Sequence, residues 1–266
     1  MGGFSIREDA TTVLMKQSTE TPITKISRSK IELFLECPRC FWLDMKEKIK
    51  RPPPAPYTIN NAIDYLLKQE FDIHREKKTR HPVMEKHGLD ALPYQTPELD
   101  KWRHNFTGVQ FFHEPTNFLV YGAVDDVWVN PEGELIVVDY KATGAKQHQI
   151  YDSYRRQLEI YQWLLEKNGF RVSPTGYFVF ARVNKANGFG LGKAALSFDL
   201  FVESIKGDSS WVETVLAGAR GAINSITIPE ASTKCEYCGY RSRASAALEE
   251  KVATPKKKKK ENRLNF

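Results

Sequence analysis

The stretch that decides the fold is Tyr121-Gly-Ala-Val-Asp125-Asp126-Val-Trp128, which is followed by Leu135-Ile-Val-Val-Asp139-Tyr-Lys141. Both segments are rich in branched and aromatic residues, as strands are, and each carries an acidic residue within an apolar run. Asn130-Pro-Glu-Gly133 between them is typical of a turn. We therefore predict two neighbouring strands that each bring a carboxylate out of the core.

Strand geometry decides which of these side chains meet. Alternate residues of a strand share one face, so Asp139 and Lys141 are expected on one face and Tyr140 on the other. Asp125 lies on the strand joined to theirs by the short turn. Asp126 follows Asp125 and should point to the opposite face, so Asp125 is the favoured ligand. Two carboxylates and one ammonium group are thus expected to converge.

This combination suits phosphodiester hydrolysis. Two carboxylates hold Mg²⁺ through oxygen ligands while the ion keeps several waters. The ion polarises a phosphoryl oxygen and lowers the pKa of a bound water, and a neighbouring lysine orients the attacking hydroxide or stabilises developing charge. An Asp-x-Lys pattern alone also arises by chance. Here Asp139 ends a run of aliphatic residues, where a lone charge is costly to bury, which strengthens the prediction.

The rest of the chain indicates a mixed α/β fold. Helices are predicted from an N-cap at Ser29 to an interruption at Pro38, from a cap at Thr58 to about Phe71, over 147–168, and from near Asp208. Strands are predicted over Val109–Phe112, Phe118–Val129, Glu134–Lys141, Thr175–Val183 and Ala195–Glu203. A crossover helix between strands implies a mixed sheet.

Three motifs together resemble the PD-(D/E)XK nuclease superfamily. Gly122-x-x-Asp125 resembles its first acidic motif, Asp139-Tyr140-Lys141 its Asp/Glu-x-Lys motif, and Gln157-Leu-Glu-Ile-Tyr161 its Gln-x-x-x-Tyr motif. The branch they resemble is RecB-like and includes CRISPR-associated adaptation nucleases and AddB-type exonuclease domains. The resemblance runs from about residue 27 to 240.

The resemblance implies a restriction-endonuclease-like mixed β-sheet flanked by helices. In that family the two acids bind Mg²⁺ or Mn²⁺, the lysine assists catalysis, and the Gln/Tyr helix lines the nucleic-acid side of the site. The chain departs from the pattern in two places. No proline precedes Asp125, and Asp64 stands where the family often has a histidine ligand. Asp64 is either a further metal ligand or a solvated or capping carboxylate.

Four cysteines form two pairs, Cys37-Pro-Arg-Cys40 and Cys235-Glu-Tyr-Cys238. Two Cys-x-x-Cys hooks can supply four thiolates to one ion or cluster, which would join the N- and C-terminal segments. By the family resemblance the metal is expected to be a [4Fe–4S] cluster, although the two-plus-two arrangement departs from the family's usual one-plus-three. Zn²⁺ is the alternative.

Composition limits the remaining possibilities. The chain has 266 residues, of which 41% are hydrophobic, and a net charge of +6. The run Lys256–Lys260 carries most of that charge, so the body is nearly neutral. We expect a flexible arm over 1–22, a single nuclease domain over 23–245 in which 79–107 is an insertion covering the cleft, and a basic disordered tail over 246–266. The residues show no secretory signal and no membrane span, so a cytoplasmic location is expected.

The predicted function is a metal-dependent DNA nuclease that acts as an exonuclease on DNA ends or single strands, in repair, recombination or CRISPR-type processing. Asp125 and Asp139 would hold the metal, Lys141 would act on the water, and Gln157 and Tyr161 would position the strand. A helicase or another repair or CRISPR protein is the expected partner. The alternatives are a non-catalytic nucleic-acid-binding module with a degenerate nuclease fold, and an RNA-processing phosphodiesterase.

Overall fold

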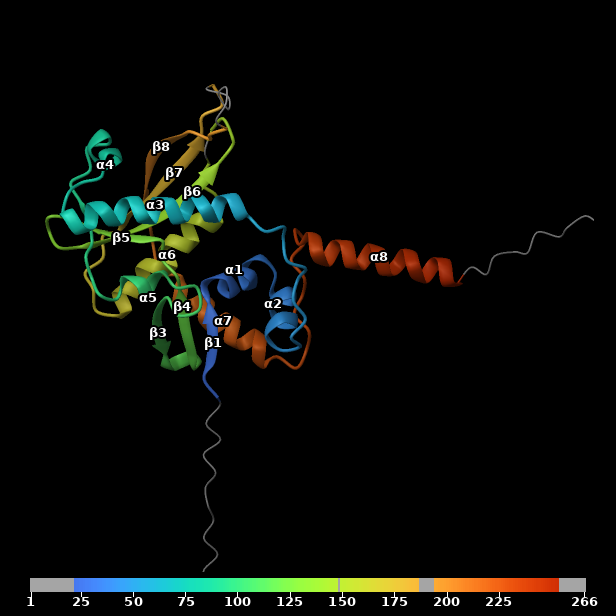
Figure 1. Cartoon of the computed structure of the whole chain (residues 1–266). Helices are drawn as coiled ribbons and strands as arrows, with labels where there is room; N and C mark the ends of the chain where they lie inside the picture. The colour runs from blue at the N-terminus through green and yellow to red at the C-terminus, as the bar shows by residue number, and fades with distance from the viewer. Residues whose placement is uncertain (1–21, 148, 187–193, 254–266) are drawn as a thin grey trace, which may run out of the picture.

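A computed structural model describes residues 22–147, 149–186 and 194–253 of the chain. Its central feature is a five-stranded sheet in the order β2-β5-β6-β7-β8 (Figure 1). The strands span Leu92–Pro93 (β2), Asp126–Val129 (β5), Leu135–Thr143 (β6), Thr175–Val183 (β7) and Phe198–Lys206 (β8). Strands β6 and β7 are parallel, and the other neighbours are antiparallel. The predicted mixed α/β architecture is confirmed.

A smaller sheet has the order β1-β4-β3. Its strands span Thr24–Ser27 (β1), Val109–His113 (β3) and Phe118–Gly122 (β4), and a short 3-10 helix, η1, spans Glu114–Thr116. Strand β1 runs parallel to β4, and β3 runs antiparallel to it. Among the described residues, no strand of this small sheet is hydrogen bonded to a strand of the central sheet.

The single long strand predicted over Phe118–Val129 is wrong, because the chain breaks between β4 and β5 and its halves join different sheets. The backbone groups in this break form hydrogen bonds with residues outside both sheets. The Val124 N–H donates to the Trp102 carbonyl at 3.1 Å, and the Arg103 side chain donates to the Asp125 carbonyl at 2.9 Å. These contacts turn Asp125 out of the sheet.

Two long helices cover opposite faces of the central sheet. They are α3 (Thr58–Lys77), which crosses the sheet in Figure 1, and α6 (Asp152–Lys167). Residues of β6 alternate between them: Ile136 and Val138 belong to the core under α3, while Leu135 and Val137 belong to the core under α6. Helix α6 also packs on the small sheet, so it lies between the two sheets.

The N-terminal helices α1 (Arg28–Glu36) and α2 (Pro38–Met45) pack against α7 (Val212–Asn224). The predicted break at Pro38 is confirmed, since proline fits the first turn of a new helix. Both predicted caps are wrong. Ser27 caps α1, its Oγ accepting from the Lys30 N–H at 3.3 Å, and Thr58 is the first residue of α3 rather than its cap.

Residues 79–107 form α4 (Pro82–Lys86), β2 and α5 (Leu99–Arg103), three elements too short to show a sequence period. Helix α8 (Glu236–Ala253) extends away from the other described elements (Figure 1). The expected disordered tail from 246 is therefore wrong for 246–253, a stretch rich in Ala, Glu and Leu without proline. Residues 1–21 of the predicted arm 1–22 and the lysine run lie outside the described residues. None of the described helices is long and apolar enough to cross a bilayer.

Candidate active site

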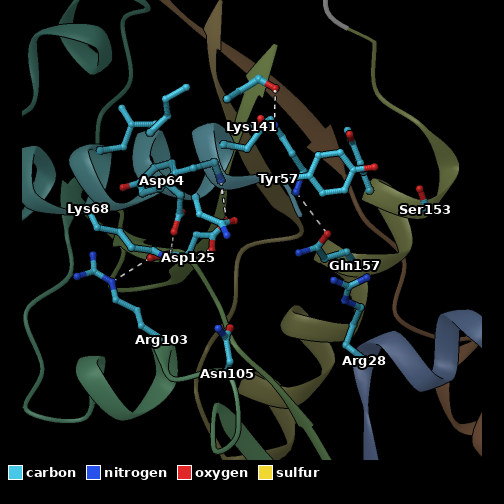
Figure 2. A pocket seen from close by; sticks show the side chains of 17 residues that line it. Arg28, Tyr57, Asp64, Lys68, Arg103, Asn105, Asp125, Lys141, Ser153 and Gln157 are labelled. Carbon is cyan, nitrogen blue, oxygen red and sulfur yellow. Dashed lines mark hydrogen bonds and ion pairs between the residues drawn. The ribbon is translucent and has the colours of Figure 1, made fainter. Parts of the chain in front are cut away.

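Asp125, Asp139 and Lys141 meet where the start of β5 lies beside β6. The Asp125 Oδ2 atom accepts a hydrogen bond of 3.0 Å from the backbone N–H of Tyr140, which stands between the other two residues. Lys141 Nζ forms an ion pair with Asp139 Oδ2. Asp125 and Lys141 line a cavity of about 840 Å³ (Figure 2). The structure thus brings together the three residues that the sequence predicted to converge.

A side chain of helix α6 holds the Asp139 carboxylate in place. Gln157 Nε2 donates to Asp139 Oδ1 at 2.7 Å and to the Tyr161 hydroxyl at 3.1 Å. Gln157 Oε1 in turn accepts from Lys141 Nζ at 3.4 Å. Tyr161 is buried, and its ring packs against Gly122, where a Cβ atom would lie only 2.5 Å from Tyr161 Cε1. Glycine at that position therefore makes room for the ring that supports Gln157.

Helix α3 adds the carboxylate of Asp64, which the sequence analysis offered as a possible metal ligand, and a lysine, Lys68, that it missed. Lys68 Nζ bridges Asp64 Oδ2 at 2.7 Å and Asp125 Oδ1 at 3.1 Å (Figure 2). Asp64 Oδ1 is buried and has no hydrogen-bond partner among the described residues. Lys68 lies four residues after Asp64, so an i,i+4 pair was visible in the sequence, but nothing local linked it to the strands.

Asp126 faces away from the cavity, as predicted. Its Oδ2 accepts from the Tyr140 hydroxyl at 2.6 Å, and its Oδ1 accepts from Arg103 at 3.1 Å and from Arg75. Asp126 is fully buried and Arg75 nearly so. Neighbouring aspartates therefore have different surroundings: Asp125 faces the cavity, and Asp126 closes a buried ionic network beneath it.

The carboxylates of the cavity differ in acidity. Burial raises the pKa of Asp139 to about 7, although the Lys141 ammonium opposes the shift. Burial and the nearby Asp125 charge raise the pKa of Asp64. Burial acts in the same direction on Asp125, but the Lys68 and Lys141 ammonium groups and the Tyr140 N–H outweigh it and lower its pKa. The site thus holds one carboxylate that ionises easily and two that resist ionisation.

Cations surround these acids. Burial lowers the pKa of Lys141, but Asp139 and Asp125 more than compensate and raise it. Arg28, in the first turn of α1, faces the cavity from the α6 side (Figure 2). Burial opposes its ionisation, but Tyr161 and Asp139 raise its pKa. Arg103 lines the opposite side. Sequence reasoning missed both arginines because they come from separate elements.

The donor set fits a hard divalent cation. Carboxylate oxygens are the ligands that Mg²⁺ and Mn²⁺ prefer. Asp64 and Asp125 share the Lys68 ammonium group, and the charges of Asp125 and Asp139 both act on Lys141. The unpartnered Asp64 Oδ1 is a buried oxygen with free acceptor capacity. The two lysine ammonium groups now neutralise this acidic cluster, as a metal ion would. Asp64, Asp125 and Asp139 are therefore the residues that would hold such an ion.

The four cysteines form a second cluster, away from the carboxylates. The Cys40 sulfur lies 3.6 Å from that of Cys235 and 3.5 Å from that of Cys238, and the Cys37 sulfur lies 3.9 Å from that of Cys238. All four sulfurs lie within 4.8 Å of one another. The cluster joins the start of α2 to the start of α8, as the sequence predicted, and its thiols can bind a metal.

A known protein family matches most of this chain. A family model described as the PD-(D/E)XK nuclease superfamily matches residues 25–243, which include every element around the cavity. A solved structure titled "Crystal structure of SSO0001" is similar over 82% of this chain and 84% of that chain, with 15% sequence identity and a TM-score of 0.40. No curated protein matches the chain.

Proposed function

Because this chain belongs to the PD-(D/E)XK nuclease superfamily, we propose that it is a metal-dependent DNA nuclease of the RecB-like branch. It hydrolyses phosphodiester bonds at DNA ends or in single strands, in the cytoplasm, in repair, recombination or CRISPR-type processing, alone or beside a helicase or another such protein. One observation carries the proposal: Asp125, from the break before β5, and Lys141, from β6, line one cavity, and Lys141 pairs there with the buried Asp139 that Gln157 holds.

A bound Mg²⁺ or Mn²⁺ ion would polarise the phosphate and acidify a water. The chain's own residues supply the rest. Gln157 fixes the Asp139 carboxylate through a bond of 2.7 Å. Lys141 keeps its proton because its pKa is raised. It therefore acts as a donor that orients the attacking water and stabilises charge on the phosphate, rather than as a base.

The cationic side chains around the carboxylates bind the substrate backbone. Lys68, Arg28 and Arg103 line the same cavity from three elements, and phosphate oxygens are the partners that lysine and arginine favour. Lys68 and Lys141 are paired with carboxylates in this structure. When the carboxylates hold a metal ion, both ammonium groups become free to contact phosphate.

For the cysteine cluster we propose a single Zn²⁺ ion. Tetrahedral zinc with Zn–S bonds of about 2.3 Å places its four sulfurs about 3.8 Å apart. Three of the six sulfur pairs in the structure are 3.5, 3.6 and 3.9 Å apart, and all lie within 4.8 Å of one another. In a [4Fe–4S] cluster each thiolate binds a different iron, which spreads the sulfurs more widely. Elemental analysis of anaerobically purified protein decides between them: zinc supports the proposal, and stoichiometric iron with visible cluster absorption overturns it.

Cleavage of end-labelled single- and double-stranded DNA with Mg²⁺ or Mn²⁺ tests the nuclease. Wild type should cleave, whereas Asp139→Asn and Lys141→Ala should lose at least about 100-fold in rate. Lys77→Ala, an exposed lysine at the end of α3, is the matched control and should cleave normally. A folded, metal-loaded wild type that binds DNA without cutting it would contradict the proposal and favour a binding module. Faster cleavage of matched RNA would make it an RNA phosphodiesterase.

A further inference from the structure

A second groove lies beside the cysteine cluster, between the chain that follows α2 and the first turn of α8. Its volume is about 630 Å³. Ile49 and Pro52 line one side, and Tyr237 and Tyr240 line the other. The two tyrosines are three residues apart on α8 and so project from neighbouring positions on one helical face. The groove thus offers two aromatic rings and an apolar wall.

The groove is open to solvent, and one of its two aromatic rings is covered on one face. Ile49 is 60% exposed and Tyr240 is 71% exposed. The Arg51 guanidinium lies over the Tyr237 ring, 4.6 Å from its centre. Arg51 is itself held by Glu36 at 2.5 Å and by the Cys235 sulfur at 3.5 Å. One face of Tyr237 is therefore covered by Arg51, which Glu36 and Cys235 hold in place, while Tyr240 remains accessible.

The rim of the groove is cationic. Lys50, Arg51 and Arg241 line it, against the single acid Glu236. Lys50 and Arg241 are exposed and form no ion pair within the described part of the chain. Exposed rings on which bases stack, with unpaired cations at their edge, are the features by which proteins hold single-stranded nucleic acid.

The groove is joined to the catalytic cavity by a stiff segment. Arg51 lines the groove and Tyr57 lines the cavity, and the residues between them are Pro-Pro-Pro-Ala-Pro. Figure 1 shows this segment passing the start of α8 on its way to α3. At about 3.1 Å per residue, six steps of polyproline II span about 19 Å. Stacked nucleotides advance about 3.4 Å each, so this span corresponds to about six nucleotides.

We propose that this groove is a second binding site for the same DNA strand, holding unpaired bases about six nucleotides from the bond that is cut. The inference rests on the proposed nuclease function. A strand that reaches both sites gains affinity because its second contact is intramolecular, whereas a short strand occupies one site at a time. Strand length should therefore determine how much the groove contributes.

The test compares affinities for fluorescent oligo-dT of 20 and 6 nucleotides by anisotropy, in an Asp139→Asn background that prevents cleavage. The ratio of the two affinities is the readout. The double variant Tyr237→Ala/Tyr240→Ala should lower this ratio about ten-fold, as loss of stacking on one or two bases predicts. Tyr237→Phe/Tyr240→Phe keeps the rings and should retain the ratio. Tyr65→Ala, which removes an exposed tyrosine outside both cavities, is the control.

An unchanged ratio in the double alanine variant would overturn the proposal, because general damage to the fold would weaken both oligonucleotides equally. An equal fall of the ratio in Tyr65→Ala would overturn it as well. The two proposals fail separately. If wild type does not cleave DNA but its affinity ratio depends on the tyrosines, the nuclease proposal is refuted and the groove proposal stands. If wild type cleaves DNA but the ratio does not depend on the tyrosines, the nuclease proposal stands and the groove proposal is refuted.

Discussion

Replacing Asp126 by asparagine should destabilise the protein by about 3 kcal/mol, although the residue lies next to Asp125, which we propose as a metal ligand. Asp126 is fully buried and pairs with Arg75, whose side chain is 6% exposed. Removing one partner of a buried ion pair costs about 3–5 kcal/mol, since the other charge stays desolvated. Both arginines would keep Asp72, to which Arg103 donates at 2.7 Å and Arg75 at 3.1 Å. That remaining contact places the loss at the lower end of the range.

Urea unfolding monitored by tryptophan fluorescence measures the loss, and a thermal scan should show a midpoint about 6–12 °C lower. The control is Asp125→Asn, one residue earlier. Asp125 is 22% exposed and lies near two other carboxylates, so neutralising it should change stability by less than about 1 kcal/mol while abolishing cleavage. The reasoning is refuted if Asp126→Asn unfolds within about 1 kcal/mol of wild type, or if the two variants lose equal stability.

Three further predictions concern the other parts of the molecule. A protonated carboxyl holds no cation, and burial raises the pKa of Asp139 to about 7, so Mn²⁺ affinity measured by calorimetry should rise about ten-fold from pH 6 to pH 8; equal affinities would contradict this. Cys235→Ser should lose the metal proposed for the cysteine cluster and about 3 kcal/mol or more of stability, and a chelator should lower the unfolding midpoint of wild type but not of the variant. Gly122→Ala should displace the Tyr161 ring, costing about 1–3 kcal/mol and reducing cleavage; Gly144→Ala, where a Cβ meets nothing within 4 Å, is the control, and equal behaviour of both would refute the steric argument.

The sequence predicted what depends on local periodicity. Alternation along one strand placed Asp139 and Lys141 together and Tyr140 on the other face, and the structure has Tyr140 in the core under α3. The spacing of Gln157 and Tyr161 along α6 placed both on one helical face, and they are hydrogen bonded to each other. Such patterns survive because a strand or helix imposes them whatever lies beyond it.

What the sequence did not predict depends on contacts between distant segments. The strand break before Asp126 comes from backbone bonds to Trp102 and from Arg103, which lie about twenty residues earlier and in a stretch without a period. Lys68 reached the site only because α3 crosses the sheet beside Asp125. Likewise, the separations between the cysteine sulfurs arise from how α2 and α8 meet, which cysteine spacing does not determine.

The two cysteine pairs of the cluster are synthesised at different times. Cys40 and Cys235 lie 195 positions apart, so at about 5–20 residues per second the first hook leaves the ribosome about 10–40 seconds before the second. During that interval Cys37 and Cys40, which supply only two of the four sulfurs, are exposed to oxidants and to competing metals. The supply of the zinc proposed for this cluster, and of reductant, during translation rather than after purification should therefore decide how much of the protein folds with all four thiols in place.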